Sequence, residues 1–335
     1  MTDDVLFLSR DQVTALLDAD TAIASQRAAF GALGAGGAAD APGPPDLPDP
    51  PDLPGKIMHP SRFDDSVVFA YVSRLSRDTG AVAKFGSVNP GNAAAGLPTV
   101  HAVITVLDPV TGELVAVMDG TAVTTLRTAA ASAVAFDALA TADSAELALI
   151  GSGTQALAHA RAVARVRDLK SVRVWSPTPE RRVRAAELLA AELGVAAEAT
   201  GTPREAVTGA SMIAACTLST TPVVRGAWLA PGCTVISVGS FEPTRSEVDA
   251  EVLRRSAAVV VDDPATAAEH AGPVIDALRD HLLTRENLIG LGEVLTGTRT
   301  ARTGPEDIVF YNSVGLGVQD AAAAWAVVRA AKGES

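Results

Sequence analysis

The feature that most constrains this chain is a short apolar run followed by two glycines and an alanine. From Leu147 to Ala158 the residues read LALIGSGTQALA, so that Gly151, Gly153 and Ala156 have the spacing GxGxxA. Glycines at the first two positions allow a tight turn and a close approach of the backbone to a phosphate, and a small third residue lets a helix pack against the preceding strand. Because Gly- and Ala-rich chains also produce this pattern by chance, its meaning depends on the flanking sequence.

The sequence around this turn alternates between short apolar runs and helical stretches. We expect strands at residues 147–150, 172–175, 212–215, 234–238 and 258–261, with helices at residues 155–166 and 180–193. Such alternation predicts a parallel sheet with crossover helices. A glycine turn after the first strand of such a sheet is typical of a dinucleotide site, where the pyrophosphate meets the N-terminus of the next helix. Gly151 and Gly153 are therefore candidate cofactor contacts in a Rossmann-type domain.

The end of the second strand bears on which dinucleotide is used. An Asp or Glu at that position usually hydrogen-bonds the ribose of NAD. Here the strand ends in WSPT, without an acid, and Arg181 and Arg182 follow. The hydroxyl groups of Ser176 and Thr178 and the guanidinium of Arg181 can bind a phosphate instead, which favours NADP(H) over NAD(H). The alternative is that both arginines belong to a solvated helix face.

The N-terminal half predicts a different architecture. Residues 9–33 have apolar residues at helical spacing, after a capping box formed by Ser9 and Gln12. Seven prolines between residues 42 and 54 predict an extended, exposed segment over residues 35–54. Five strands are then expected in an antiparallel sheet, at residues 56–58, 67–74, 82–88, 99–107 and 114–118. An Ala-rich helix at residues 119–140 leads into the Rossmann-type domain, and a last helix at residues 317–331 can fold back onto the N-terminal domain.

Composition excludes several classes of partner. The 335 residues suffice for about two domains, and 48% of them are apolar. A net charge of −12 argues against a nucleic-acid or anionic-membrane partner. No run approaches the roughly 18 apolar residues of a membrane span, and the first eleven residues lack the features of a signal peptide. Cys216 and Cys233 form neither a zinc-site spacing nor a disulfide framework. We expect a cytoplasmic protein that binds a small molecule and no metal.

Two basic residues upstream of the glycine turn do not fit a simple core. Lys84 lies inside an apolar strand, and Arg127 lies on a helix among small residues that let another molecule approach. In these and three further segments the chain resembles the ornithine cyclodeaminase/μ-crystallin family of NAD(P)-binding proteins. The resemblance runs from about Ile57 to Ala330, and its segments are KFGSVNPGNAAAGLPT, TGELVAVMDGTAVTTLRTAAASA, LALIGSGTQA, PGCTVISVGSFEPTRSEVD and VFYNSVGLGVQDAAAA.

The resemblance implies a fold and an assembly. It implies an α/β fold in which a Rossmann-type parallel-sheet domain is inserted into a second α/β domain with an antiparallel sheet. Residues 1–127 and 314–335 would form the substrate-binding and dimerisation domain, and residues 128–313 would form the dinucleotide-binding domain. The chain would be a homodimer.

The resemblance also implies site residues. Lys84 and Arg127 match substrate-contacting residues that face the nicotinamide, with Arg127 gripping a carboxylate bidentately. Lys84 would hold that carboxylate or protonate an imine or amine nitrogen. Further cofactor contacts would be Thr99, Arg127, Thr154, Gln155, Thr217, Val238, Gly239, Arg245 and Ser313. Phe241 and Val314 would contact the substrate.

Two departures from the family pattern bear on the reaction. Phe241 stands where the cyclodeaminases have a catalytic aspartate, which argues against ornithine cyclisation; Glu242 is adjacent, but neighbouring side chains on a turn seldom point alike. The segment around residues 44–46 lacks an arginine that the family uses for a second carboxylate contact. That contact is then missing, or is supplied by Lys56, Arg62 or Arg74.

The resulting hypothesis is NAD(P)H-dependent reduction of a small imine of an amino acid, or the reverse amino-acid dehydrogenation. Hydride would pass from the cofactor to the imine carbon while the protein orients the reactants. One alternative is an ornithine- or lysine-type cyclodeaminase that uses another base. A second alternative is a non-catalytic, NADPH-dependent binder of small ligands.

Overall fold

The computed structural model describes residues 5–36 and 50–334. The chain divides into two compact units, here called unit 1 (residues 1–127 and 316–335) and unit 2 (residues 128–315). The first boundary lies inside helix α3 (Gly120–Leu139), and the second lies two residues beyond the 313/314 boundary that the sequence suggested.

Unit 1 is built on a six-stranded sheet with the order β1-β6-β5-β4-β3-β2. Its strands are β1 (Leu6–Leu8), β2 (Ile57–Pro60), β3 (Val67–Ser73), β4 (Val82–Val88), β5 (Val100–Leu107) and β6 (Leu114–Asp119). The five predicted strands are all present and pair with one another in antiparallel fashion. The sheet is nevertheless mixed, because β1, which the sequence did not predict, pairs in parallel with β6.

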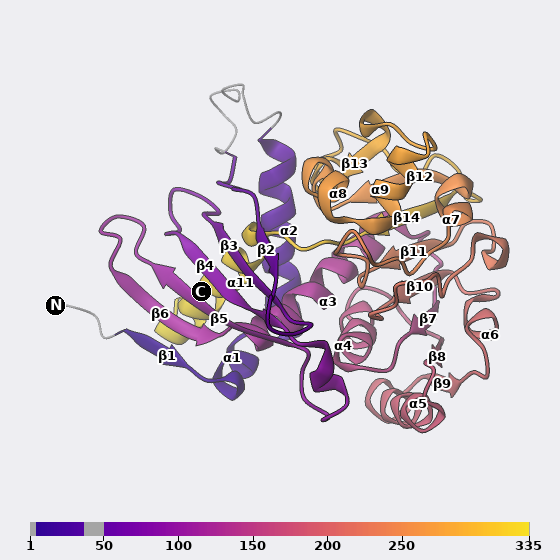
Figure 1. Ribbon diagram of the computed structural model, residues 1–335, viewed down its shortest axis with the longest axis horizontal. Coiled ribbons are helices and arrows are strands. Elements are labelled where there is room, and N and C mark those ends of the chain that lie inside the picture. Colours follow the sequence, from indigo (N-terminus) through magenta and orange to yellow (C-terminus); the bar gives the residue numbers. More distant parts are fainter. Residues whose placement is uncertain (1–4, 37–49, 335) are drawn as a thin grey trace. The chain divides into compact units, whose positions relative to one another are not determined.

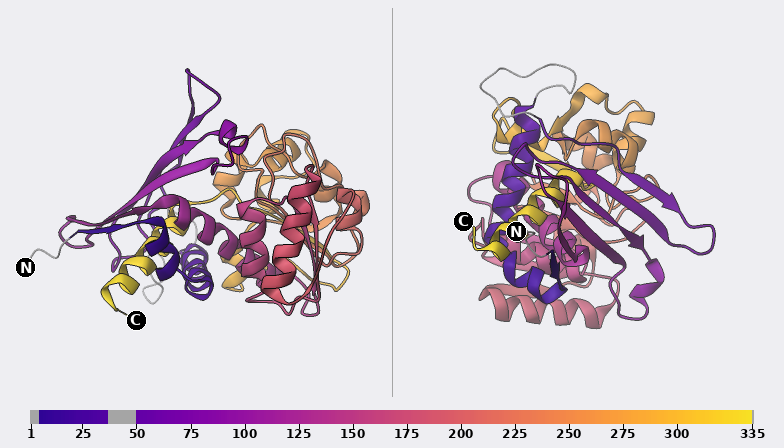
Figure 2. Two further views of the ribbon diagram at one scale, coloured as in Figure 1. Left: turned by 90° about the horizontal axis from the view of Figure 1, so that it is seen from below. Right: turned by 90° about the vertical axis from the view of Figure 1, so that its left-hand side faces the viewer.

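Three helices cover one face of this sheet, namely α1 (Arg10–Leu16), α2 (Ala19–Ala35) and α11 (Gly317–Lys332) (Figure 2, left). The single helix predicted over residues 9–33 is two helices, because Asp18 starts a second one by accepting a hydrogen bond from the Thr21 amide at 2.8 Å. The capping box of Ser9 and Gln12 begins the first helix as predicted. The last helix packs on the sheet through Trp325, whose Nε1 donates to the Gly80 carbonyl at 3.1 Å.

The other face of the sheet is apolar and open to solvent. Its exposed side chains include Phe7, Ile57, Val68, Val72 and Phe85, the last 57% exposed. The pairing registers place all of them on one face, because side chains alternate along each strand. We call these five residues the open face. No helix of unit 1, in the ranges that the structure describes, covers it.

Unit 2 is an eight-stranded parallel sheet with the order β13-β12-β14-β11-β10-β7-β8-β9, which Figure 1 shows from top to bottom. Its strands are β7 (Glu146–Ile150), β8 (Ser171–Trp175), β9 (Ala196–Ala199), β10 (Met212–Ala215), β11 (Thr234–Ser237), β12 (Ser256–Val261), β13 (Leu288–Gly290) and β14 (Ile308–Asn312). The helices are α4 (Thr154–Val163), α5 (Pro179–Leu193), α6 (Pro203–Val207), α7 (Ala250–Arg255), α8 (Pro264–His270), α9 (Gly272–Arg279) and α10 (Leu291–Leu295). Short 3₁₀ segments occur at η1 (Pro90–Ala93) in unit 1 and at η2 (Gly226–Trp228) and η3 (Arg285–Asn287) in unit 2.

The five strands predicted for this sheet are confirmed, and β9, β13 and β14 are additions. The central strands are buried except for Glu146 at the start of β7, as near-continuous apolar runs in parallel sheets are. From β7 the chain proceeds to β8 and β9 on one side and then returns to β10 on the other. The carboxyl ends of β7 and β10 therefore form a topological switch point, where open parallel sheets bind ligands.

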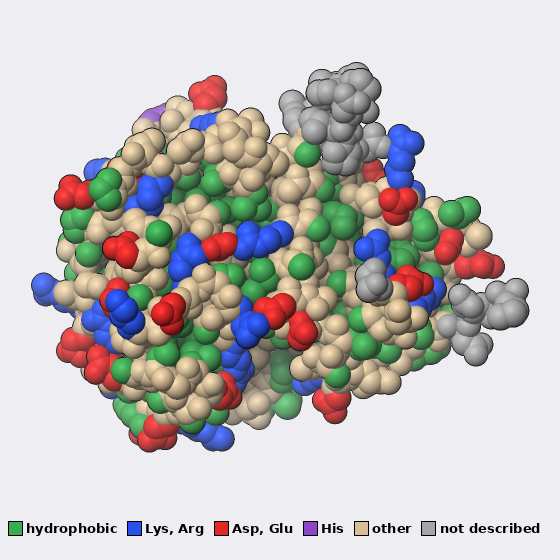
Figure 3. Space-filling model, turned by 180° about the vertical axis from the view of Figure 1, so that it is seen from behind, with side chains coloured by type: hydrophobic (Ala, Val, Ile, Leu, Met, Phe, Trp, Pro, Cys, Tyr) green, Lys and Arg blue, Asp and Glu red, His purple; other side chains and the backbone are tan. Residues whose placement is uncertain are grey.

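The charged surface and the lengths of the helices fit the predicted lack of a membrane-spanning segment. Charged side chains of both signs are interspersed over the face shown in Figure 3. Within the described ranges, every helix is too short or too polar to cross a membrane. Most of the predicted proline-rich segment, including residues 44–46, lies outside the described residues; near its end, Asp52 pairs with Arg74 in an isolated antiparallel bridge.

Candidate functional site

The turn after β7 has the geometry that a dinucleotide site needs. Gly151 has φ +126°, a conformation that favours glycine, and a Cβ atom there would lie 2.6 Å from the Cys216 carbonyl oxygen. Gly153 is the N-cap of α4, and a Cβ atom placed there would meet no atom within 4 Å. Ala156 is fully buried beneath the helix. The turn is therefore closed on the β10 side by backbone and open above Gly153, where a pyrophosphate can approach.

The first residues of α4 supply hydrogen-bond donors at this opening. Thr154 and Gln155 are the first two residues of the helix, and Gly153 offers no side chain to cap their N–H groups. Unsatisfied N–H groups and the positive end of the helix dipole favour an anion at this place. These features fit the pyrophosphate of NAD(P)(H), a cofactor that supplies or accepts hydride when bound.

The loop after β8 is organised around Ser176. Its Oγ accepts from Ser152 Oγ at 2.8 Å and donates to the Thr178 carbonyl at 3.3 Å. Arg182 donates to the Ser176 carbonyl at 2.9 Å, whereas Arg181 is exposed on α5. Of the two arginines, Arg182 is thus the one that the fold turns toward the end of β8, although the sequence favoured Arg181.

A buried carboxylate that the sequence interpretation missed ties together the loops after β10 and β11. Glu247 is fully buried and accepts from the Thr217 amide at 2.5 Å, from Thr217 Oγ1 at 2.7 Å and from the Gly239 amide at 2.7 Å. Ser237 Oγ donates at 2.7 Å to Oε2, the oxygen that also accepts from Gly239, whereas both Thr217 contacts are made to Oε1. Burial raises the pKa of Glu247, and these hydrogen bonds act in the opposite direction. Thr217 and Gly239, two predicted cofactor contacts, are therefore held by the same buried carboxylate. Val238, a third predicted contact, is the first residue after β11 and directly precedes Gly239.

A second missed carboxylate fixes the segment after β14. Asp262, at the end of β12, accepts from Ser313 Oγ at 3.2 Å and from the Val314 and Gly315 amides at 2.7 Å each. Tyr311 also donates to this carboxylate. Ser313 and Val314, predicted contacts of cofactor and substrate, are thereby held at the carboxyl edge of the sheet.

Phe241, Glu242 and Arg245 form a cluster at the same edge. Arg245 Nε donates to Glu242 Oε2 at 3.0 Å, and the guanidinium lies 5.2 Å from the Phe241 ring centroid. Arg245 Nη1 also donates to the Leu218 carbonyl at 3.2 Å. Glu242 Oε2 is thus paired with Arg245, whereas Glu242 Oε1 is buried and has no hydrogen-bond partner among the described residues.

Unit 1 contains a buried cluster of two cations and one carboxylate. Nζ of Lys84, on β4, lies 2.6 Å from Oδ2 of Asp320, and Nε of Arg127 lies 3.1 Å from Oδ1 of the same residue. Lys84, Arg127 and Asp320 are 2%, 5% and 1% exposed. Gln319 Oε1 accepts from Arg127 Nη1 at 3.3 Å. The structure thus joins the two predicted substrate contacts through an aspartate that the sequence interpretation did not single out.

Burial changes the protonation of Lys84. Desolvation, assisted by the charges of Arg127 and Lys56, lowers the pKa of Lys84 to about 7, although Asp320 acts to raise it. A lysine with this pKa exchanges a proton near neutral pH, as a general acid or base requires. Its ammonium also lies 4.5 Å from the Tyr71 ring centroid, within range of a cation–π contact.

Of the three basic residues considered for the second carboxylate contact, Lys56 lies nearest this cluster. Its Nζ is 6.0 Å from the centroid of the same Tyr71 ring. Arg74 donates instead to four loop carbonyls, including that of Thr79 at 2.8 Å, and Arg62 is exposed. Thr99, the remaining predicted contact in unit 1, precedes β5 and accepts from the Asn89 amide at 2.7 Å.

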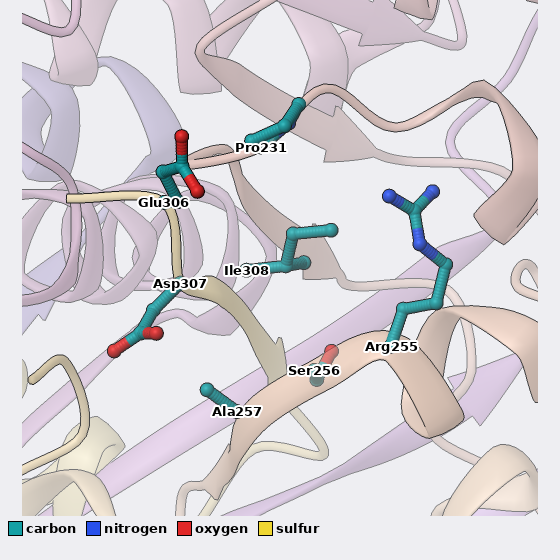
Figure 4. A pocket seen from close by; sticks show the side chains of 7 residues that line it. All are labelled: Pro231, Arg255, Ser256, Ala257, Glu306, Asp307 and Ile308. Carbon is teal, nitrogen blue, oxygen red and sulfur yellow. The ribbon is translucent and has the colours of Figure 1, made fainter. Parts of the chain in front are cut away.

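A separate surface hollow occurs at the opposite edge of the unit 2 sheet (Figure 4). It is lined by Pro231, Arg255, Ser256, Ala257, Glu306, Asp307 and Ile308. Arg255 donates to the Leu229 carbonyl at 3.2 Å, and Asp307 accepts from the Thr303 and Gly304 amides at 2.7 Å each. Because β12 and β14 begin here, the hollow lies away from the carboxyl edge where dinucleotides bind.

Comparison with known proteins agrees with this geometry. A family model described as ornithine cyclodeaminase/mu-crystallin family matches residues 52–335. This chain belongs to that family. The resemblance on which the sequence interpretation rested is therefore confirmed.

Three relatives illustrate the family. Ketimine reductase mu-crystallin of Mus musculus is 33% identical over 234 residues, 70% of this chain and 71% of the relative. The structure of Thermococcus litoralis Delta(1)-pyrroline-2-carboxylate reductase in complex with NADH and L-proline has a TM-score of 0.91 and 29% identity, and the match covers 98% of each chain. An archaeal alanine dehydrogenase dimer with bound NAD has a TM-score of 0.87 and 29% identity over 98% of this chain and 96% of that chain. These family members are nicotinamide-dependent oxidoreductases of imines or amino acids, and the predicted fold class is confirmed.

Proposed function

We propose that this protein is an NAD(P)H-dependent reductase of a small imine that carries a carboxylate, able to run in reverse as an amino-acid dehydrogenase. The observation that carries the proposal is the buried cluster of Lys84 and Arg127 on a single aspartate. Two cations and one carboxylate leave one positive charge, and a buried net charge is costly until an anion compensates it. The carboxylate of an imino acid supplies that anion.

Arg127 and Lys84 have different roles in the proposed reaction. Arg127 uses Nε for Asp320 and Nη1 for Gln319, and among the described residues none accepts from its Nη2, which remains for a substrate carboxylate. Lys84 donates a proton to the nitrogen as the imine becomes an amine. In the reverse direction neutral Lys84 removes a proton from the amine. A bound reduced nicotinamide supplies the hydride, and the remainder of the catalysis is orientation and proton transfer.

The missing catalytic aspartate supports reduction over cyclodeamination. Phe241 occupies that position under the guanidinium of Arg245, and the only adjacent acid, Glu242, is paired with the same arginine. A phenylalanine cannot manage protons in ornithine cyclisation, and the charge of the neighbouring acid is offset by Arg245. Lys56, beside Tyr71, is our candidate for the second carboxylate contact.

We infer further that NADP(H) is preferred over NAD(H). Three features of the loop after β8 support this preference. No acid follows β8, the Ser176 hydroxyl is buried, and Arg182 donates to the Ser176 carbonyl. Thr178, at the N-cap of α5, adds a second hydroxyl. A 2′-phosphate would meet hydrogen-bond donors here, whereas a free ribose would lack its usual carboxylate partner.

The open face of unit 1 supports a homodimer. Four of its exposed apolar side chains lie on the neighbouring strands β2, β3 and β4, and monomeric proteins rarely leave a large apolar patch uncovered. A related alanine dehydrogenase is a dimer, and we propose the same state for this chain.

Two free thiols, Cys216 and Cys233, are consistent with the reducing cytoplasm, where we place the protein.

One plate assay tests the function. Cyclic imines, 2-oxo acids with amines, and ornithine or lysine are each supplied with NADPH and with NADH, while absorbance and ammonia are followed. Imine-dependent oxidation of the cofactor is the expected result. Ammonia release from ornithine or lysine without net cofactor turnover would indicate a cyclodeaminase, and cofactor binding without any turnover would indicate a ligand-binding protein.

A further inference from the structure

We propose that Asp320 is a positioning residue of this reaction, which aims the Lys84 ammonium and the Arg127 guanidinium and keeps Lys84 charged as a proton donor. The inference rests on the proposed imine reduction but assigns a role to a residue outside the predicted site.

Asp320 is placed so that each of its oxygens serves a different cation. Oδ2 lies 2.6 Å from Lys84 Nζ and Oδ1 lies 3.1 Å from Arg127 Nε, and the aspartate is 1% exposed. It belongs to the first turn of α11, which packs on the same sheet that carries Lys84. Its position is therefore set by the fold and does not depend on a bound substrate.

The neighbours of Asp320 restrict the remaining freedom of both cations. An ammonium has three N–H groups. Asp320 Oδ2 forms an ion pair with the Lys84 ammonium at 2.6 Å, and Thr124 Oγ1 accepts from Nζ at 3.5 Å. In the described part of the chain no further oxygen or nitrogen accepts from Nζ, so at least one N–H is left for a substrate. Gln319, which itself accepts from the Leu316 amide at 2.7 Å, fixes Arg127 Nη1 in the same manner.

The charge of Asp320 matters as much as its position. The groups that face Lys84 are Asp320 from α11, Arg127 from α3, Lys56 from the segment before β2 and the Tyr71 ring from β3. Burial, Arg127 and Lys56 all lower the pKa of Lys84, and Asp320 alone opposes them. Without that charge, Lys84 would be neutral at pH 7 and could not donate a proton. A merely structural aspartate would have no such effect on the pH profile.

The test compares Asp320→Asn with Asp320→Glu and with the control Asp137→Asn. Asp137 also pairs with an arginine, Arg167, but it belongs to unit 2 and makes no contact with the three residues of the cluster among those recorded for the described chain. For each variant, kcat/KM for imine reduction is measured against pH, and the titration of Lys84 is followed by NMR of ¹³C-labelled lysine with Lys84→Met used for assignment. Circular dichroism and NADPH binding confirm that each variant is folded.

In Asp320→Asn we expect the Lys84 midpoint and the alkaline limb of the profile to fall together by about one pH unit or more, the effect of losing an adjacent opposite charge. Asp320→Glu should keep the midpoint near that of the wild type but lower kcat, because the added methylene displaces the carboxylate. Asp137→Asn should change neither quantity. A folded Asp320→Asn with an unmoved Lys84 midpoint would overturn the proposal.

Full wild-type kcat in Asp320→Glu would overturn the positioning role even if Asp320→Asn did not fold. The NMR titration also separates this proposal from the function on which it rests. If the wild type reduced no imine and the Lys84 midpoint still fell in Asp320→Asn, the reductase assignment would be wrong while the electrostatic link between the two residues stood.

Discussion

Lys84 Nζ and Asp320 Oδ2 lie 2.6 Å apart with both side chains almost completely buried, so the candidate proton donor is tied to a fixed negative charge. A buried lysine without a partner would be strongly destabilising, and removing its carboxylate leaves an uncompensated charge. Buried ionisable groups with a shifted pKa cluster at functional sites, which supports a role for this pair in the proposed reaction.

Replacing Lys84 by methionine should abolish most of the reductase activity while the fold is retained. Methionine fills a similar volume but cannot donate a proton, and general acids contribute about 10²–10⁴-fold to such reactions. We expect kcat for imine reduction to fall by about 100-fold or more. Steady-state kinetics with saturating NADPH measures this, and near-wild-type reduction by Lys84→Met would exclude the lysine as the proton donor.

The two reaction directions should depend oppositely on pH. Burial lowers the pKa of Lys84 to about 7, so the charged form that donates a proton is lost as the pH rises through 7. Imine reduction should therefore decline above pH 7, and amine oxidation, which needs neutral Lys84, should rise over the same range. Initial rates in both directions, measured between pH 5.5 and about 9 with the same buffer series, test this. Parallel profiles in the two directions would contradict it.

Replacing Gly151 by alanine should destabilise the protein and weaken cofactor binding. The substitution combines a positive φ with a Cβ atom 2.6 Å from the Cys216 carbonyl oxygen. Such strain costs about 1–3 kcal/mol before the close contact is added. Gly209→Ala is the matched control, because Gly209 also has a positive φ but has no atom within 4 Å of its Cβ position. Denaturant unfolding should show a larger loss for Gly151→Ala, and equal losses would mean that the contact with Cys216 is unimportant.

The proposed preference for NADP(H) should depend on the arginines of α5. Arg182 approaches Ser176 and Arg181 lies beside it, and a charge-assisted hydrogen bond to a phosphate contributes about 1.5–3 kcal/mol. We expect Arg182→Ala to raise KM for NADPH by about tenfold, with Arg181→Ala having a smaller effect and KM for NADH unchanged in both. Arg184→Ala, exposed on the same helix, serves as the control. A wild-type enzyme that uses NADH more efficiently than NADPH would refute the preference.

Much of the fold was accessible from the sequence because its signals are local. Alternation of apolar residues marked the strands from β2 to β6, and the glycine spacing at Gly151 marked the first turn of the parallel sheet. β1 and β13 have three residues each, and β9 reads AAEA, so periodicity is too short or too weak to reveal them. The parallel pairing of β1 with β6 depends on residues more than 100 positions apart and has no local signal.

Only some of the candidate site residues could be predicted, because the others are connected by contacts between residues far apart in the sequence. The family segments indicated Lys84 and Arg127 as site residues, but three carboxylates that contact predicted site residues were missed, namely Asp320 in unit 1 and Glu247 and Asp262 in unit 2. Asp320 contacts Arg127 across 193 positions, and no spacing rule connects such residues. One signal was available: Asp320 is the only acid in an Ala-rich helix that is otherwise mostly buried, and buried acids are usually paired.

Replacing Phe85 by glutamate should convert the proposed dimer to monomers without unfolding unit 1. Phe85 lies at the centre of β4 on the open face and is 57% exposed, so the substitution removes little packing within the chain. At an interface, however, two symmetry-related carboxylates would be desolvated against apolar strands, which is strongly unfavourable. Sedimentation velocity should show a wild-type dimer and a Phe85→Glu monomer with an unchanged circular dichroism spectrum. Val110→Glu, in the exposed turn between β5 and β6, is the control and should remain dimeric. A wild-type monomer, or a dimer that survives Phe85→Glu, would show that the open face is not the subunit interface.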